Sequence, residues 1–298
     1  MEPSSEGAGA GGLAPSDGGD GSSGNGAPLR ESILWRIERL TNGQAIDLAE
    51  HIDHFPEVKA AFGIPNATLE LIPGRCEASL EDGGALELVG FLHSRNGAQD
   101  HLVAQFQREI HLDRECAEHK WLKVEPAFRG YGISSALLLR SFGFYKALGL
   151  SGVELDAGME TGRWHWARVG FDFMWPRDRE RVRDWALEVA ERLNMHRPGM
   201  ETFESATQFA RMEGNRKVSL AELAESVPSM RGRIEAVAAQ NYLEMGTRIQ
   251  LGRAVMLTGP GWEGRLDLHG PSYVQFKSYA DAKAEEAKRL LADGGQPG

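Results

Sequence analysis

The sequence predicts an α+β protein with a mixed, mostly antiparallel central sheet flanked by helices, and with a helical insertion before the last strands. Three observations lead to this prediction. Short strands punctuated by turn residues fill residues 67–124, a strand, helix, strand, helix, strand order follows over residues 120–174, and residues 177–250 have helical periodicity. The chain of 298 residues is long enough to bury a sizeable apolar core.

The N-terminal residues differ from the rest in composition. Residues 1–28 are mostly Gly, Ser and Ala without apolar periodicity, so we expect a disordered tail. They lack the basic and apolar regions of a secretory signal peptide, and no run of about 18 apolar residues predicts a membrane span. Residues 31–62 have apolar side chains at helical spacing, with breaks at Asn42-Gly43 and Pro56, and predict two short helices.

Turn signals divide the next part of the chain into consecutive elements. Antiparallel strands are expected over residues 68–72, 86–92, 102–112 and 120–124. A helix over residues 134–148 should end at a left-handed Gly149, and a strand should follow over residues 152–156. Thr161 is a candidate N-cap for a short helix that Gly170 ends, before a strand over residues 171–174.

The last third of the chain is expected to leave the sheet and then return to it. Residues 254–258 and 265–268 have strand character, and a final helix is expected over residues 279–292. The predicted units are a tail (1–28), a core (29–176), a helical insertion (177–252), closing strands of the core (253–276), and a C-terminal helix with its tail (277–298).

Charge and cysteine content limit the classes of function. The formal net charge of −10 argues against a general nucleic-acid binder, because neutralising phosphates requires a local surplus of Lys and Arg. It favours cationic substrates, or it simply keeps the protein soluble. Cys76 and Cys116 lie in no metal-binding pattern and fit a reducing cytoplasm, although one disulfide between them stays open. His51 and His54 lack a clear third ligand, so we predict no metal site.

The turn between the strand that ends near Val124 and the following helix carries the most chemical information. At the start of such a helix, several backbone N–H groups have no intrahelical partner. Glycines let a phosphate approach the main chain, Arg129 adds positive charge, and the helix dipole favours an anion. Ser134 and Ser135 stand where the dinucleotide fingerprint needs a third glycine, so that fingerprint is not matched. The predicted anion-binding residues are Arg129, Gly130, Tyr131, Gly132, Ile133 and Ser134.

Two segments in this part of the chain resemble the GNAT superfamily of N-acyltransferases. The first contains Arg129-Gly130-Tyr131-Gly132, preceded by Leu122, Val124 and Pro126, and is similar to the family motif Arg/Gln-x-x-Gly-x-Gly/Ala between the fourth strand and the third helix. The second, Trp166-Ala167-Arg168-Val169-Gly170-Phe171, is similar to the family's Tyr-x-x-x-Gly-Phe. The resemblance covers residues 121–173 and implies a GNAT-like core.

The resemblance implies a co-substrate and its binding residues. Acetyl-CoA or another acyl-CoA would place its pyrophosphate on the backbone amides of residues 129–134, and its pantetheine along the strand edge at Leu122 and Val124. One strand amide would polarise the thioester carbonyl. The acyl acceptor would be the amine of a small molecule or of a protein.

A transferred acyl group needs a deprotonated amine, and hence a base. The resemblance places this base at Glu118, with Glu109 and His111 on the preceding strand as substitutes. Trp166 stands where many relatives have a tyrosine acid, and an indole does not release its proton near neutral pH. His165 is adjacent, but one residue along a helix turns a side chain by about 100° and is expected to aim it elsewhere.

Two functions remain open from the sequence. The first is an active N-acyltransferase whose helical insertion shapes the acceptor pocket. The second is a weak or inactive scaffold that senses acyl-CoA or binds a protein partner, which Trp166, and Met159 at a position where relatives often have asparagine, favour. Trp164, Trp166 and Trp175 line a pocket or fill the core. No nucleic-acid or membrane partner is expected, and a homodimer stays open.

Overall fold

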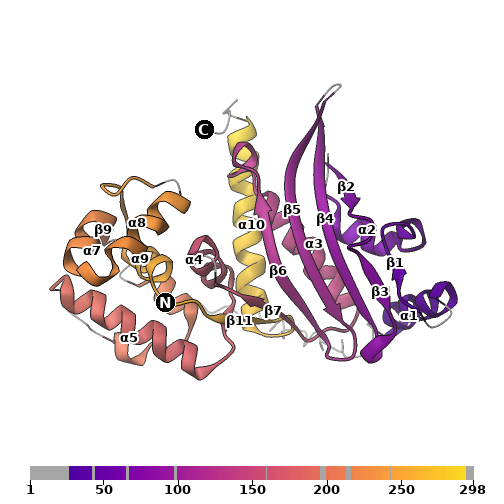
Figure 1. The fold of residues 1–298 in the computed structure, drawn as a ribbon, viewed down its shortest axis with the longest axis horizontal. Helices are drawn as coiled ribbons and strands as arrows, with labels where there is room; N and C mark the ends of the chain where they lie inside the picture. The colour runs from indigo at the N-terminus through magenta and orange to yellow at the C-terminus, as the bar shows by residue number, and fades with distance from the viewer. Residues whose placement is uncertain are drawn as a thin grey trace, which may run out of the picture.

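Figure 1 shows the fold of the chain in a computed structural model. A large sheet with its helices forms one part, and a group of helices that includes α5 forms the other, with α4 and β11 between them. This mixed α+β architecture, with a mostly antiparallel sheet flanked by helices, confirms the predicted fold class. The structure describes residues 27–41, 44–64, 67–96, 99–158, 160–194, 199–212, 216–241 and 243–292.

The main sheet of the described residues has nine strands in the order β1-β3-β4-β5-β6-β7-β11-β8, with β2 also paired to β4. Every pairing is antiparallel except that of β6 with β7. The bounds are Ile46–Asp47 (β1), Ala67–Leu71 (β2), Glu77–Ser79 (β3), Ala85–Asn96 (β4), Gln99–His111 (β5), Cys116–Val124 (β6), Gly152–Asp156 (β7), Asp172–Phe173 (β8) and Glu263–Asp267 (β11).

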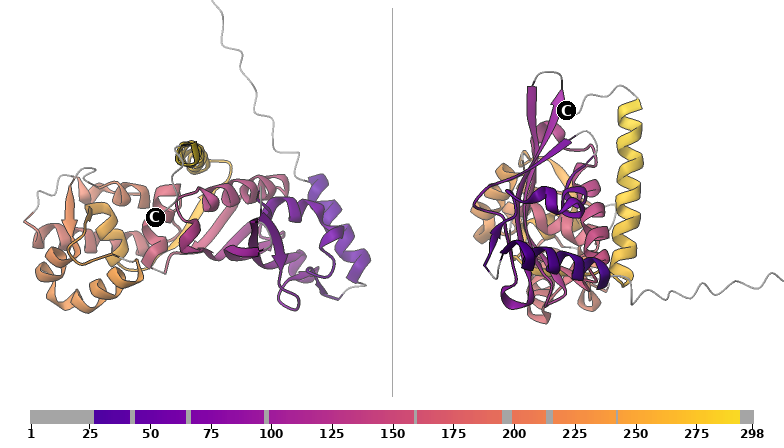
Figure 2. Two further views of the ribbon diagram at one scale, coloured as in Figure 1. Left: turned by 90° about the horizontal axis from the view of Figure 1, so that it is seen from above. Right: turned by 90° about the vertical axis from the view of Figure 1, so that its right-hand side faces the viewer.

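The two faces of the sheet differ because side chains alternate along each strand. In β5 the buried Phe106, Arg108 and Ile110 alternate with the partly exposed Gln107 and Glu109. The buried series faces the layer of α2, α3 and α10, with α10 outermost (Figure 2). The flanking helices are Ala27–Thr41 (α1), Pro56–Phe62 (α2), Ile133–Ala147 (α3), Glu160–Val169 (α4) and Pro271–Ala292 (α10), with short 3-10 turns at Ile52–His54, Glu81–Gly83 and Pro126–Phe128.

Aromatic side chains fill the space between the sheet and these helices. Phe62 of α2 stacks on Phe106 of β5 with ring centroids 5.3 Å apart, and Phe142 of α3 packs on Phe276 of α10 at 4.5 Å. Burying each such ring stabilises the fold by about 2–3 kcal/mol. The central strands and α3 are thereby fixed relative to each other.

Glycines end two of these helices, as the sequence predicts. Gly149 has φ +78° and its N–H donates to Lys146 O, which stops α3. Gly170 has φ +111°, and a Cβ on it would lie 2.7 Å from the backbone oxygen of Ser272. Any larger residue at 170 would therefore push α10 away from the end of α4.

The helical region packs on α4 and also contains a small sheet that the sequence did not predict. Two short strands, β9 and β10, pair antiparallel apart from the main sheet. A Cβ on Gly252 would lie 2.6 Å from the backbone oxygens of Phe209 and Ala210, so α9 and α6 touch through their main chains. The bounds are Pro176–Arg192 (α5), Met200–Thr202 (3-10), Ala206–Ala210 (α6), Lys217–Ser219 (β9), Leu220–Ser226 (α7), Pro228–Met230 (3-10), Arg231–Gln240 (α8), Arg248–Gln250 (β10) and Leu251–Thr258 (α9).

The structure corrects several predicted elements. Residues 254–258, expected as a closing strand, belong to helix α9, because a short apolar run that is buried on all sides has the same pattern in a helix and in a strand. Only β11 therefore closes the sheet in the predicted unit 253–276. The C-terminal helix begins at Pro271 rather than near residue 279.

Four smaller differences from the predictions lie in the N-terminal part of the chain and in α4. Residues 46–47 form β1 where a second helix was expected, and that helix begins at Pro56. The short strand β3 was missed, and Thr161 lies inside α4 rather than capping it. The first helix begins at Ala27, inside the segment expected as a tail, while residues 1–26 lie outside the described part of the chain.

Two further properties bear on the cellular setting. Within the described residues, no helix is long and apolar enough to cross a membrane. Cys76 and Cys116 are both buried free thiols, so the disulfide left open by the sequence is not formed.

Candidate active site

The parallel pair β6 and β7 separates along its length. The two strands pair from Cys116 to His119 of β6 and from Gly152 to Leu155 of β7. Beyond that point β6 continues to Val124, whereas β7 ends one residue later at Asp156. Among the described strands, none pairs with the other edge of residues 120–124, and the sheet opens there.

A bulge in β6 lies at the start of this opening. Gln107 of β5 pairs with Trp121, whereas the next residue, Arg108, pairs with His119, so Lys120 is one extra residue in β6. Such a bulge bends the strand and re-aims its side chains. Arg108 Nη1 donates to the carbonyls of Gln107 at 2.7 Å and Trp121 at 2.6 Å, which satisfies the disturbed backbone.

A cleft of about 570 Å³ occupies the opening between the two strands. Its walls come from the unpaired part of β6, the end of β7, α4, and the ends of α8 and α9 in the helical region. Such a volume is in the range of small-molecule sites. The lining residues are His119, Lys120, Trp121, Leu122, Lys123, Val124, Arg129, Ser134, Asp156, Ala157, Gly162, Trp164, His165, Trp166, Gln240, Asn241, Arg253 and Leu257.

The predicted anion loop lies at one end of this cleft. Gly130 and Gly132 have φ +89° and +72°, and α3 begins directly afterwards at Ile133. Among the described residues, no backbone carbonyl accepts a hydrogen bond from the N–H groups of residues 130–134. Arg129 Nε donates to Val124 O at 3.1 Å, which holds the loop beside β6.

The C-terminal helix rests against the same loop. A Cβ on Gly132 would lie 3.5 Å from the backbone oxygen of Lys283 and 3.6 Å from Ala287 Cβ. Both are ordinary van der Waals distances, so α10 supports the loop from the side of Gly132. Gly130, by contrast, is exposed, and a Cβ there would meet nothing within 4 Å.

The structure therefore brings together part of the predicted cofactor site. Leu122, Val124, Arg129 and Ser134 line the cleft directly. The other predicted residues, Gly130, Tyr131, Gly132 and Ile133, belong to the adjoining loop and do not line the cleft. The loop thus reaches the cleft at its two ends, Arg129 and Ser134.

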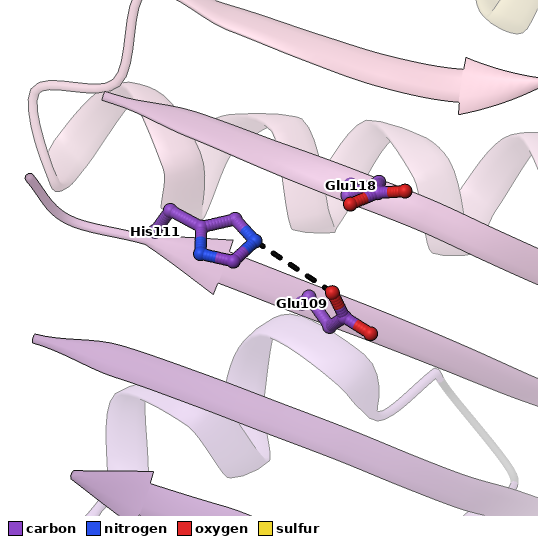
Figure 3. Close-up of side chains that lie close together, drawn as sticks. All are labelled: Glu109, His111 and Glu118. Carbon is purple, nitrogen blue, oxygen red and sulfur yellow. Dashed lines mark ion pairs between the residues drawn. The ribbon is translucent and has the colours of Figure 1, made fainter. Parts of the chain in front are cut away.

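The three predicted bases form one cluster, shown in Figure 3. Glu118 of β6 and Glu109 and His111 of β5 have ligand atoms within 4.8 Å of one another, a grouping that could hold a metal ion. Lys120 Nζ already lies 2.6 Å from Glu118 and 3.1 Å from Glu109. These carboxylates hold the pKa of Lys120 above its usual value despite its partial burial. The ammonium group thus supplies the positive charge that a metal ion would bring.

Glu118 itself lies beside the cleft but does not line it, whereas the next residue, His119, does. His119 Nε2 is 3.1 Å from the Tyr145 hydroxyl, and its Nδ1 is buried without a hydrogen-bond partner. Burial, with Arg108 nearby, puts the pKa of His119 well below its usual value, so the imidazole is neutral at pH 7. Burial also lowers the pKa of Arg108 to about 10, against the raising effect of Tyr145.

Two consecutive residues of α4 face the cleft. Trp166 lines it at the position of the family's tyrosine, and His165 lines it as well, contrary to the expectation that its side chain points elsewhere. Burial, and then the charges of Arg168 and Lys283, lower the pKa of His165 to about 4. A neutral imidazole therefore stands beside the indole. Met159 lies outside the described residues.

Of the remaining tryptophan and histidine candidates, only Trp164 lies at the cleft. Trp164 lines the cleft, with the guanidinium carbons of Arg168 and Arg253 at 4.5 and 4.9 Å from its ring centroid. Trp175 is 41% exposed and lies away from the cleft, where its Nε1 donates to Glu263. The ring centroids of His51 and His54 are 6.1 Å apart, and no described residue joins them as a third metal ligand.

Several lining residues were not foreseen from the sequence. Asp156 stands at the carboxyl end of a parallel strand, a position where ligands commonly bind, and that signal was available. His119 was not predicted, because the resemblance placed the base at the preceding residue, Glu118. Arg253 had no usable signal, because its segment was assigned to a strand.

Comparison with known proteins adds no name to this site. No protein-family model matches the chain, and no curated protein matches it either.

Proposed function

We propose that the protein is an acyl-CoA-dependent N-acyltransferase, which moves an acetyl or other acyl group from CoA to an amine. The observation that carries the proposal is the opening between β6 and β7, next to a loop whose N–H groups donate to no backbone carbonyl of the described residues. A strand edge and the two ends of the loop, Arg129 and Ser134, thereby line one cleft. Acyl-CoA is a ligand that needs both, because it joins a pyrophosphate to an amide-containing arm.

The residues present fit this ligand. The N–H groups of residues 130–134 would bind the pyrophosphate, aided by the dipole of α3 and the charge of Arg129. The free edge of β6 at Leu122 and Val124 would pair with the amides of pantetheine, as an added strand does. An N–H group of the bulged segment near Lys120 would then polarise the thioester carbonyl.

The reaction joins the amine nitrogen to the thioester carbon and breaks the carbon–sulfur bond. The attacking ammonium, with a pKa near about 10, must first lose a proton, and the leaving thiolate must gain one. The cleft provides three candidates for these transfers. Asp156 and the neutral His119 line it directly, while Glu118 lies one residue away and is ion-paired with Lys120.

We assign the role of the base to Asp156 or to Glu118, and substituting each residue in turn distinguishes between them. Asp156 is exposed in the cleft and makes no ion pair with a described residue. Glu118 can accept the proton only if Lys120 moves away. A thiol with a pKa near about 8.5 leaves without a strong acid, so Trp166 in place of a tyrosine slows turnover rather than preventing it.

A catalytically weak acyl-CoA sensor is the second candidate. The observation in its favour is that none of the cleft-lining residues among those described is a tyrosine. A sensor and an enzyme share the binding step and differ in thiol release. Free thiols at Cys76 and Cys116 and the use of acyl-CoA are compatible with the cytoplasm, where we place either activity.

Isothermal titration with acetyl-CoA and with acetyl-pantetheine tests the proposal. Acetyl-CoA should bind and raise the melting temperature, because it stabilises the folded state by mass action. Acetyl-pantetheine lacks the pyrophosphate and should bind far more weakly. Thiol release with a panel of amines then separates the enzyme from the sensor. Equal affinity for the two thioesters, or no binding of either, would refute the proposed function.

A further inference from the structure

Arg253 is a cleft residue that the acyl-CoA site does not require. It lies in α9, within the helical region, and lines the cleft together with Leu257 of the same helix. The CoA-binding elements, β6 and the loop before α3, belong to the core. Arg253 therefore belongs to the wall where the acceptor would lie.

Among the acids that the structure describes, none is paired with Arg253. Its guanidinium lies 4.9 Å from the centroid of Trp164, and its Nε is buried without a hydrogen-bond acceptor. Within the described part of the chain, no carboxylate forms an ion pair with it. Burial, and then the charge of a second cation, Arg168, lower the pKa of Arg253.

The lysines that line the cleft differ from Arg253 in this respect. Lys120 is paired with Glu118 and Glu109, and Lys123 lies 3.1 Å from Glu125. A half-buried guanidinium beside a second guanidinium gains more from an incoming anion than a surface cation does, because less water screens the interaction. The cleft therefore contains a site suited to one negative group, and a planar carboxylate matches the guanidinium fork.

Asp156 provides the opposite charge in the same cleft. It lines the cleft from the end of β7 and forms no ion pair with a described residue. The nearby Arg265 is paired with Glu154 instead. A ligand that carries an ammonium group and a carboxylate would satisfy both Asp156 and Arg253.

We propose that the acyl acceptor is a free amino acid, with its carboxylate bound by Arg253 and its amino group directed toward Asp156. This inference rests on the proposed function and names its substrate class. The net charge of −10 favours a cationic acceptor, whereas this proposal names an acceptor that also carries a carboxylate. The reason is that Arg253 makes this wall of the cleft positively charged. Polyamines lack the carboxylate that this wall would bind.

Matched acceptors test the carboxylate directly. Free amino acids with α-, β- and γ-amino groups are compared in thiol release from acetyl-CoA, each next to its amide and its decarboxylated amine. The best amino acid should have a KM about 10- to 100-fold lower than its amide, the range expected for a hydrogen bond to a charged group. The same amino acid, without acetyl-CoA, should raise the melting temperature more than its amide does.

Three variants assign the effect to one side chain. R253Q should raise the KM for the amino acid about 10- to 100-fold and leave the KM for the amide unchanged, and R253K should recover part of the loss. R168Q is the matched control, because Arg168 contacts the same Trp164 ring without lining the cleft. It should keep the preference for the carboxylate.

The outcomes separate this inference from the proposed function. Amides that react as well as amino acids, in a protein that binds acetyl-CoA, would overturn the amino-acid proposal alone. Weaker acetyl-CoA binding in R253Q, with an unchanged KM for the acceptor, would assign Arg253 to a CoA phosphate and also overturn it. Amino-acid binding that depends on Arg253 in a protein without affinity for acetyl-CoA would support the site and refute the transferase.

Discussion

The substitution G130D tests the anion loop with the least disturbance to the fold. Gly130 is exposed, has φ +89°, and offers open space where a Cβ would be added. An aspartate there would add a negative charge to the loop, and two unit charges about 6 Å apart repel by roughly 1–3 kcal/mol at dielectric constants between those of water and a protein surface. We therefore expect the Kd for acetyl-CoA to rise about 5- to 150-fold.

Two controls isolate the charge from the backbone. G130N has the same size and the same left-handed backbone but no charge, so it should bind more tightly than G130D. G199D introduces the same charge at a similar φ, +78°, in a loop outside the cleft. Each substitution costs about 1–2 kcal/mol for the left-handed backbone, and each should lower the melting temperature of the free protein by a few degrees.

Calorimetric titration at low and high salt completes the test. The difference between G130D and G130N should shrink at high salt, because ions screen an exposed charge. Equal affinities of these two variants at low salt would remove the pyrophosphate from the loop. An equal loss in G199D would show that the effect is global rather than local.

The remaining predictions concern stability and proton transfer. The pKa of His165 is about 4 in the folded state and roughly 6.5 in the unfolded state, so the unfolded state binds more protons between these pH values. The free energy of unfolding therefore falls as the pH drops below about 6.5, by up to roughly 2 kcal/mol at pH 5. H165Q should flatten this pH dependence in urea titrations, and an unchanged dependence would contradict the assignment to His165. G252A should destabilise the protein by more than about 2 kcal/mol, because its Cβ would clash with two backbone oxygens. G143A, in open space within α3, should instead stabilise the protein by about 0.5–1 kcal/mol. Melting temperatures that move in the same direction in both variants would refute this contrast. D156N should lower kcat about 100-fold and E118Q less than tenfold if Asp156 is the base, and the reverse order in thiol-release assays would assign the base to Glu118.

Much of the core could be predicted because local chemistry determines it. The strand at Gly152–Asp156 and the helix Ile133–Ala147 match their predicted bounds to within one residue, and Gly149 has the positive φ that its position required. Their apolar periods are long or are ended by glycine, so tertiary context had little to override. The turn between β6 and α3 at residues 129–132 was predicted for the same reason.

The errors arise where packing rather than local pattern decides. The apolar run at residues 254–258 is buried on all sides in α9, so neither a helical nor a strand period is visible in it. The cleft was harder still to predict, because it is formed by residues distant in sequence. Arg253 meets Trp164 only after the helical region folds back on α4. His119 was missed because its importance depends on burial, which the sequence does not display.

Because Lys120 is one extra residue in β6, deleting it would preserve the pairing of this strand with β5. His119 pairs with Arg108 and Trp121 pairs with Gln107, so removing Lys120 would leave both pairs intact as consecutive pairs of a regular antiparallel ladder. Every flanking side chain would keep its side of the sheet. A chain shortened by that one residue would thus straighten the strand without changing which face each side chain is on, and would also remove the ammonium group that lies between Glu118 and Glu109.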